Sequence, residues 1–143
     1  LSLIYLSLRN NLFQMKYKRI LLKLSGEALM GDGEYGIAPE KIAEYAKDIQ
    51  TVVNKGCQVA IVIGGGNIFR GQLAAQWGIE RAEADNIGMM GTVINSLMLR
   101  GVLSAKAQGR IEVRVMSAIP INTVAEPFIR LRSIHHLEKN LLQ

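Results

Sequence analysis

The chain has 143 residues, of which 49% are hydrophobic and 20% are charged, and its formal net charge is +5 at pH 7. This composition is typical of one globular domain and excludes an intrinsically disordered chain. A single cysteine cannot form an internal disulfide, and two histidines give no metal-ligand cluster. We therefore expect a cytoplasmic protein without a bound metal. The basic residues are scattered and not interleaved with aromatics, so we expect no nucleic-acid partner.

The first fourteen residues differ from the rest of the chain. Their apolar stretch is too short to span a bilayer, and it lacks the basic start of a signal peptide. The strongly patterned sequence begins at Lys16, directly after Met15. We interpret residues 1–14 as an upstream extension and residues 15–143 as the folded part, and we expect no membrane partner.

Two apolar runs flank a predicted helix. RILLKL at 19–24 and VAIVI at 59–63 are typical of buried strands. Between them, Pro39 suits the first helical position and Gly56 suits the end. Apolar residues recur every three or four positions in this helix: Ile42, Tyr45, Ile49 and Val52. A strand, helix, strand unit of this kind predicts parallel pairing through a right-handed crossover.

The second half of the chain continues the alternation. Asp85 is a candidate N-cap for a long helix that ends near Gly109. The apolar face predicted for this helix consists of Met89, Val93, Leu97 and Met98. A third strand is predicted at 111–116 and a last helix at 126–139. The order of elements predicts an α/β domain with three layers, α/β/α, around a mainly parallel sheet.

Glycine-bearing turns follow both of the first two strands, namely Ser25–Gly26 and Gly64–Gly66. In α/β sheets, ligands bind at the carboxyl ends of the strands, where both of these turns lie. We therefore expect the two turns to meet at one crevice.

The first turn, KLSGE at 23–27, combines a lysine with two amides that a ligand can approach closely. These groups suit a phosphate. Alternatively, Lys23 extends to solvent and Gly26 only relieves a tight turn. The spacing does not decide between these interpretations.

In the second turn, three glycines without Cβ atoms would let backbone amides form an anion-binding concavity. No Walker A lysine follows, so this is not a standard P-loop. Arg70 could reach back and grip phosphate oxygens bidentately. Alternatively, the glycines allow two chain segments to cross and Arg70 is an ordinary surface residue. Asp85 also has a second interpretation, as an acceptor for ribose hydroxyls or a base edge.

GDGEYG at 31–36 matches the letters of a dinucleotide-binding fingerprint. Its context argues against that function, because it starts seven residues after the strand and carries Asp32 and Glu34, which would repel phosphate. We interpret it as a flexible surface loop.

Four ordered motifs carry a resemblance to a known family: KLSGEAL at 23–29, VIGGGNIFRG at 62–71, ADNIGMMGTVIN at 84–95 and MSAIPIN at 116–122. From about Lys16 to Lys139 the chain resembles the bacterial UMP kinases of the amino acid kinase superfamily. The resemblance implies a homohexameric transferase of pyrimidine biosynthesis. It would transfer a phosphoryl group from ATP, with Mg²⁺ on the donor phosphates, to UMP, giving UDP.

The resemblance also implies roles for individual residues. The ATP-binding set would be Lys23, Ser25, Gly26, Gly66 and Arg70, with Lys23 and Arg70 as the catalytic residues. The UMP contacts would be Gly65 and Asp85. The 31–36 loop matches a family loop implicated in activation by GTP: Gly31, Asp32, Gly33, Glu34, Tyr35 and Gly36. Arg100 matches a GTP-site position, whereas Gly101 and Ser104 depart from the family's pattern there.

The family's later segments, which embrace UMP and hold the ATP base, lie beyond the resemblance. We therefore expect a kinase domain that is incomplete at its C-terminus. One alternative is a non-catalytic truncated subunit or anion-binding fragment that docks with a full-length kinase. Another is a different superfamily member, such as an aspartate or glutamate kinase.

Overall fold

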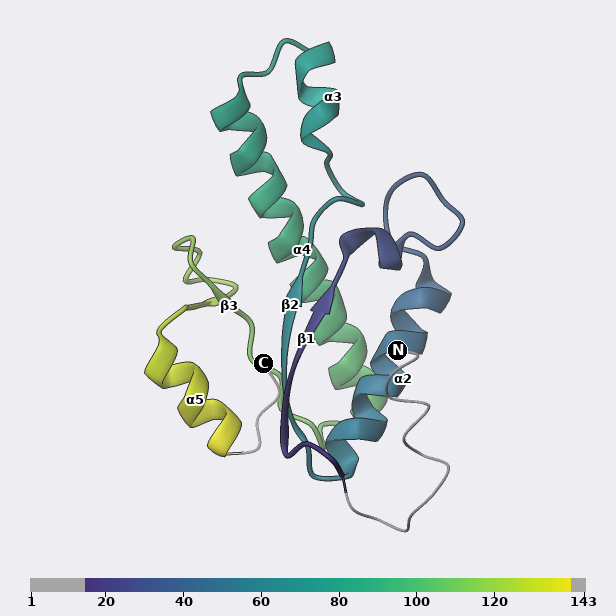
Figure 1. Ribbon diagram of the computed structural model, residues 1–143, viewed down its shortest axis with the longest axis vertical. Helices are drawn as coiled ribbons and strands as arrows, with labels where there is room; N and C mark the ends of the chain where they lie inside the picture. Colours follow the sequence, from purple (N-terminus) through teal and green to yellow (C-terminus); the bar gives the residue numbers. More distant parts are fainter. Residues whose placement is uncertain (1–14, 140–143) are drawn as a thin grey trace.

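The computed structural model describes residues 15–139, so the expectations about residues 1–14 and 140–143 lie outside the described part of the chain. Figure 1 shows two central strands flanked by helices. The strands are β1 (Arg19–Leu24), β2 (Gln58–Ile63), β3 (Met116–Ser117) and β4 (Glu126–Pro127). The helices are η1 (Gly26–Leu29), α2 (Pro39–Asn54), α3 (Gly71–Gln76), α4 (Arg81–Ala107) and α5 (Arg130–Glu138).

Strands β1 and β2 pair in parallel, as their sequences predict, and the register runs from Arg19 opposite Gln58 to Leu24 opposite Ile63. Side chains alternate between the two faces of a strand. The inward residues of both strands join one core with α2 and α4, in which Leu29 and Leu103 are fully buried. Burial of such a side chain stabilises the fold by about 1.5–3 kcal/mol. This core fixes the carboxyl ends of β1 and β2 side by side.

Helix α2 forms where its periodicity predicts it. Pro39 occupies the first turn, Ile42 and Ile49 are buried, and Ala46 between them is fully enclosed. Gly56, just beyond the helix, has a φ of 86°, a conformation that glycine adopts without strain. The predicted start and stop signals of this helix are therefore confirmed.

Helix α4 departs from the sequence prediction in two ways. It begins at Arg81 with Glu80 as N-cap, so Asp85 lies exposed inside the helix and the N-cap interpretation is wrong. The buried side is only partly as predicted, because Val93 is buried but Met89 and Met98 are exposed. The buried positions are Ala84, Gly91, Val93, Asn95, Leu99, Leu103 and Ala107. A pattern of apolar residues did not find Gly91 and Asn95 because neither residue counts as apolar.

Helix α4 is long and apolar enough to cross a membrane, by length and composition alone. Core helices of globular proteins meet the same criterion. Here the helix packs against α2 and β2, and its buried residues Leu99 and Leu103 belong to the common core. One face of this helix is therefore part of the core.

The third layer is α5. Figure 1 shows the β1–β2 sheet between α2 on one side and α5 on the other, and α5 contacts β2. Parallel strands with helices on both faces confirm the α/β class. Helix α5 does not cover the whole outer face of the β1–β2 sheet, because Leu21 and Val62 remain 70% and 53% exposed.

Two predicted elements near the end of the described chain are wrong in extent. The strand expected at 111–116 is reduced to one bridge at Val113 and the short β3, which pairs in parallel with β4. The last helix starts at Arg130, not at Glu126. Pro127 explains the later start, because a residue before proline is biased away from the helical conformation.

Glu126, in β4, interacts with charged or hydrogen-bonding side chains of two other segments, the 113–116 segment and α5. Its carboxylate accepts a hydrogen bond from His136 Nε2 at 3.0 Å and pairs with Arg114 at 3.3 Å. The hydrogen bond from His136 is the largest cause that lowers the pKa of Glu126 below its ordinary value. A carboxylate with a lowered pKa stabilises the fold above its unfolded-state pKa of about 4.3, and this contribution is lost as the pH falls through the folded-state pKa.

We therefore expect Glu126→Gln to lower the melting temperature at pH 7, because the charged interactions of this carboxylate are removed. The difference from the unsubstituted chain should shrink as the pH falls below about 4. Melting curves from pH 7 to pH 3 would measure it. A difference that stays constant over that range would show that the Glu126 charge contributes nothing.

Candidate functional site

The turns after β1 and β2 lie against each other, as the sequence predicts. Gly64 N donates to Leu24 O at 2.9 Å. A Cβ atom added to Gly26 would lie 2.7 Å from Gly64 O and 2.9 Å from Gly66 N, closer than real Cβ contacts occur. Gly26 therefore permits a close approach of two backbones. One edge of the sheet thus brings Ser25, Gly26 and Gly64–Gly66 together.

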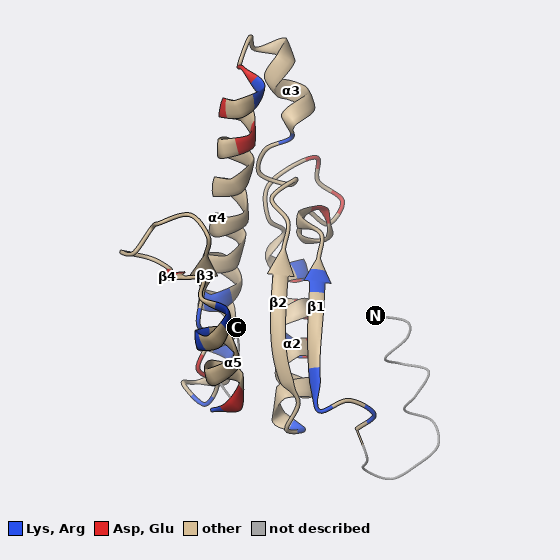
Figure 2. Cartoon of the chain, turned by 60° about the vertical axis from the view of Figure 1, so that its left-hand side comes forward, with Lys and Arg blue, Asp and Glu red and all other residues tan. Residues whose placement is uncertain are grey.

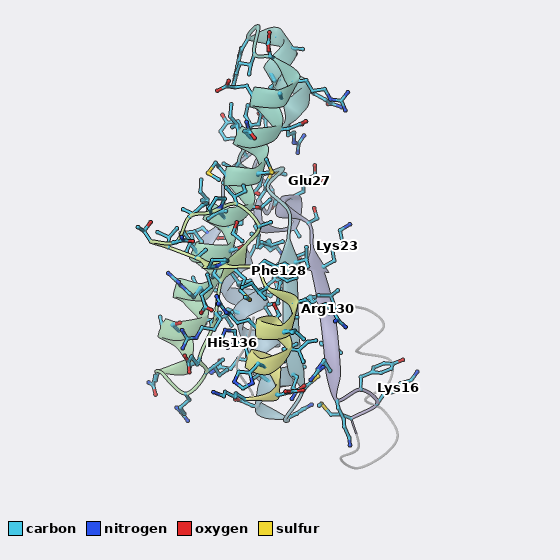
Figure 3. All side chains as sticks on the ribbon, turned by 90° about the vertical axis from the view of Figure 1, so that its left-hand side faces the viewer. Lys16, Lys23, Glu27, Phe128, Arg130 and His136 are labelled. Carbon is cyan, nitrogen blue, oxygen red and sulfur yellow. The ribbon has the colours of Figure 1, made fainter. Side chains whose placement is uncertain are left out.

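The first turn leads from the end of β1 into η1, with Ser25 exposed and Gly26 buried. Ser25 caps η1, and its Oγ accepts a hydrogen bond from Glu27 N at 3.1 Å. Lys23 is exposed, and Figure 3 shows it near Glu27 at this end of β1, far from Lys16 at the other end. An exposed lysine beside a helix-starting turn suits a phosphate.

Arg70 reaches back over the second turn. Its Nε donates to Gly66 O at 3.3 Å, and its Nη2 lies 3.3 Å from Glu27 Oε1. Its side chain is 45% exposed, so the guanidinium remains open to a ligand. Glu27, a residue with no role predicted from the sequence, thus pairs with the guanidinium that was predicted to bind phosphate.

Helix α4 packs closely against Gly65, the middle glycine of the second turn. A Cβ atom on Gly65 would lie 2.8 Å from both Gly88 O and Thr92 N. Asp85 precedes Gly88 by about one helical turn and is exposed. Asp85 therefore lies about one turn before the part of α4 that contacts Gly65.

None of the three glycines has a φ in the left-handed region, since the glycines with positive φ are Gly31, Gly36, Gly56, Gly78 and Gly109. Close contact with neighbouring backbone explains Gly65. Gly66 is different, because the nearest atoms to its Cβ position belong to Glu27 at 3.9 Å. A crossing of segments, one of the two explanations offered by the sequence, thus accounts for Gly65, whereas the side of the turn beside Gly66 is open.

The 31–36 segment is a loop between η1 and α2, as predicted (Figure 1). Tyr35 at its tip is 78% exposed. Gly36 at its end is bound to the second turn, because Gly36 N donates to Asn67 O at 2.7 Å and Asn67 Nδ2 donates to Gly36 O at 2.8 Å. The loop therefore contacts the site through its last residue.

Asn67 and Asn95 are further residues of the site that sequence reasoning missed. Both side chains are fully buried, and they donate hydrogen bonds to each other at 3.1 and 2.6 Å. Asn95 Nδ2 also donates to Gly64 O at 2.7 Å. The only signal in the sequence was a polar residue inside an apolar helical stretch.

Charges around the crevice have both signs. Figure 2 shows basic residues at both ends of β1 and acidic residues in the first turns of α4. Within residues 15–139, no group of three or more His, Cys, Asp and Glu side chains could hold a metal ion. Arg100 lies apart from the crevice. It lines a cavity of about 60 Å³ between β2, α4 and the 113–116 segment, and it donates to Val124 O.

Comparison with known proteins identifies the class. The family model described as the amino acid kinase family matches residues 18–141. The chain therefore belongs to the amino acid kinase family. A carbamate kinase from Giardia lamblia bound to AMP-PNP has the same fold, with 18% identity and a TM-score of 0.55 over 89% of this chain and 55% of that one.

Within this family, the more similar proteins are uridylate kinases. Those of Frankia alni and Xanthomonas axonopodis pv. citri are each 54% identical, over 87% and 88% of this chain and 48% and 51% of their own lengths. The crystal structure of UMP kinase from Bacillus anthracis aligns with a TM-score of 0.83 and 55% identity, over 90% of this chain and 52% of that one. This chain spans about half the length of the curated relatives it matches.

Proposed function

We propose that this chain carries the phosphate-binding part of a UMP kinase, which transfers a phosphoryl group from ATP to UMP and gives UDP. The observation that carries the proposal is the convergence of two glycine-bearing turns with Arg70 folded back on Gly66. Uridylate kinases at 54% identity support UMP as the acceptor.

In this proposal the donor phosphates of ATP lie on the amides of Ser25, Gly26 and Gly66. Lys23 and Arg70 neutralise the negative charge that spreads over the transferred group, which lowers the barrier without a covalent intermediate. Mg²⁺ bound to ATP would neutralise further phosphate charge, and it needs few protein ligands because the phosphates themselves supply oxygens.

The acceptor lies on the other side of the turn. Gly65 contacts UMP through its backbone, and Asp85 accepts hydrogen bonds from UMP. Because α4 packs directly on Gly65, the acceptor contacts keep a fixed position relative to the donor turn. Positioning of two bound reactants is a large part of phosphoryl-transfer catalysis.

We further propose that the protein acts in the cytoplasm as a homohexamer. Its candidate effector is GTP at the 31–36 loop, although Gly101 and Ser104 depart from the family's GTP-site pattern. The exposed Leu21 and Val62 favour a second candidate, a subunit without turnover that docks with another kinase chain.

Ligand-induced stabilisation tests the substrate. A ligand at one hundred times its Kd stabilises the fold by about 2.7 kcal/mol, which a melting curve detects. We expect UMP and ATP with Mg²⁺ to raise the melting temperature, and aspartate and glutamate to leave it unchanged. Preferential stabilisation by either amino acid would contradict the proposal and favour another member of the family.

Assays of UDP formation separate the two candidates. We expect turnover when the chain is mixed with the C-terminal half of a uridylate kinase, because that half completes the site. Steady turnover by the chain alone would show that it holds a complete site. Binding of UMP without turnover in any mixture would favour the non-catalytic subunit.

A further inference from the structure

Asn67 and Asn95 are the two polar side chains that are fully buried among residues 15–139. A buried amide is costly unless its donors and acceptors find partners. Here all four N–H groups have partners: each asparagine donates once to the other, and they also donate to Gly36 O and Gly64 O. The pair is therefore a closed network with no freedom to rearrange.

Each end of this network lies on a different part of the site. Gly36 ends the 31–36 loop, Gly64 begins the glycine turn, and Asn95 is on α4, which carries Asp85. A Cβ atom on Gly26 would collide with Asn67 Oδ1, so the first turn also rests on this side chain. One pair of amides thus contacts four segments.

The geometry makes these segments depend on one another. If the loop moves away, Asn67 Nδ2 loses Gly36 O, and the amide can follow only by releasing Asn95. If Asn95 is released, Gly64 O loses its donor at the start of the turn. Buried hydrogen-bond networks are stable when complete and unfavourable when partly satisfied. The loop and the turn are therefore expected to order together.

We propose that Asn67 and Asn95 are positioning residues of the site, which couple the order of the 31–36 loop to the glycine turn and to α4. The coupling is a property of the fold, while its consequence for ATP and UMP rests on the function proposed above. An anion on the turn fixes Gly64 and so holds Gly36 through the pair. Conversely, loss of the pair loosens the donor turn and the loop together.

The test uses Asn95→Leu, a substitution of similar shape that removes the hydrogen bonds. Asn95 does not bond to the loop, so a merely local role predicts no change there. We expect hydrogen exchange of the Gly36 amide, which donates to Asn67 O, to accelerate on the order of tenfold, with exchange in β1 and β2 unchanged. The ATP affinity, measured by calorimetry with Mg²⁺, should fall by a similar factor.

Ser96→Ala is the matched control, because the Ser96 hydroxyl bonds only to Thr92 O within α4, at 2.8 Å. It should change neither exchange in the loop nor ATP affinity. Normal loop exchange in folded Asn95→Leu would overturn the coupling. Failure of the unsubstituted chain to bind ATP or UMP would overturn the proposed function alone, because the exchange measurement needs no ligand.

The unsubstituted chain provides a second measurement if Asn95→Leu does not fold. Tripolyphosphate, which resembles the donor phosphates without the nucleoside, is expected to slow exchange of the 31–36 amides when it binds the turn. Binding detected by calorimetry without slower exchange in the loop would contradict the coupling.

Discussion

Replacing Gly65 by alanine is expected to destabilise the fold by about 1–3 kcal/mol or more, the range for overpacking a close contact. The added methyl group would lie 2.8 Å from Gly88 O and Thr92 N, which are backbone atoms of α4 and cannot rotate away. The helix would have to shift from the turn. Urea unfolding monitored by circular dichroism measures the loss.

Gly66→Ala is the matched control for this prediction. Its Cβ would lie no closer than 3.9 Å to another residue, so stability should change by less than about 0.5 kcal/mol. ATP affinity should nevertheless fall, because the methyl group occupies the open side of the turn. If Gly65→Ala and Gly66→Ala destabilised the fold equally, the contact with α4 would not explain why residue 65 is a glycine.

Arg70→Ala is expected to weaken ATP binding on the order of tenfold to one hundredfold while the fold remains intact. Hydrogen bonds to charged groups contribute about 1.5–3 kcal/mol, and a half-exposed arginine contributes little to packing. Arg70→Lys should give an intermediate affinity, since an ammonium group cannot bind two phosphate oxygens in a fixed plane. Calorimetric titration with ATP and Mg²⁺ measures both.

Glu27→Gln, which removes the charge that pairs with Arg70, is expected to change ATP affinity in the opposite direction. The Glu27 carboxylate pairs with the Arg70 guanidinium, so a phosphate must displace it. Removal of that competing charge should raise ATP affinity a few-fold at most, because exposed ion pairs contribute about 0–1 kcal/mol. If Arg70→Ala bound ATP as tightly as the unsubstituted chain, Arg70 would be an ordinary surface residue.

The elements that the sequence predicts well have local causes. The apolar runs that form β1 and β2, the Pro39 start of α2 and the turn at Gly56 depend on neighbouring residues, and all three elements are confirmed. Helix α3 and η1 were missed because they are short and begin with glycine, a poor helix former. The start of α5 was misplaced although Pro127 carried the signal.

The buried face of α4 was in part predicted incorrectly, because it depends on tertiary contacts. Hydrophobicity placed Met89 and Met98 on the buried face, but the face that packs on the glycine turn needs small residues and a hydrogen-bonding one. Gly91 and Asn95 meet these needs, and neither counts as apolar in a periodic pattern. A pattern cannot show which backbone a helix will meet.

By itself, the sequence determined the α/β class, the two parallel strands, the position of both glycine-bearing turns at one sheet edge and the resemblance to a nucleotide kinase. Each follows from short-range spacing or from motif order. Only the tertiary structure decided which glycine contacts α4, that Glu27 faces Arg70, and that Asn67 pairs with Asn95 from 28 residues away. The reason is physical: these contacts join segments that are distant in the chain, and their geometry is set by the packing of α4 against the sheet.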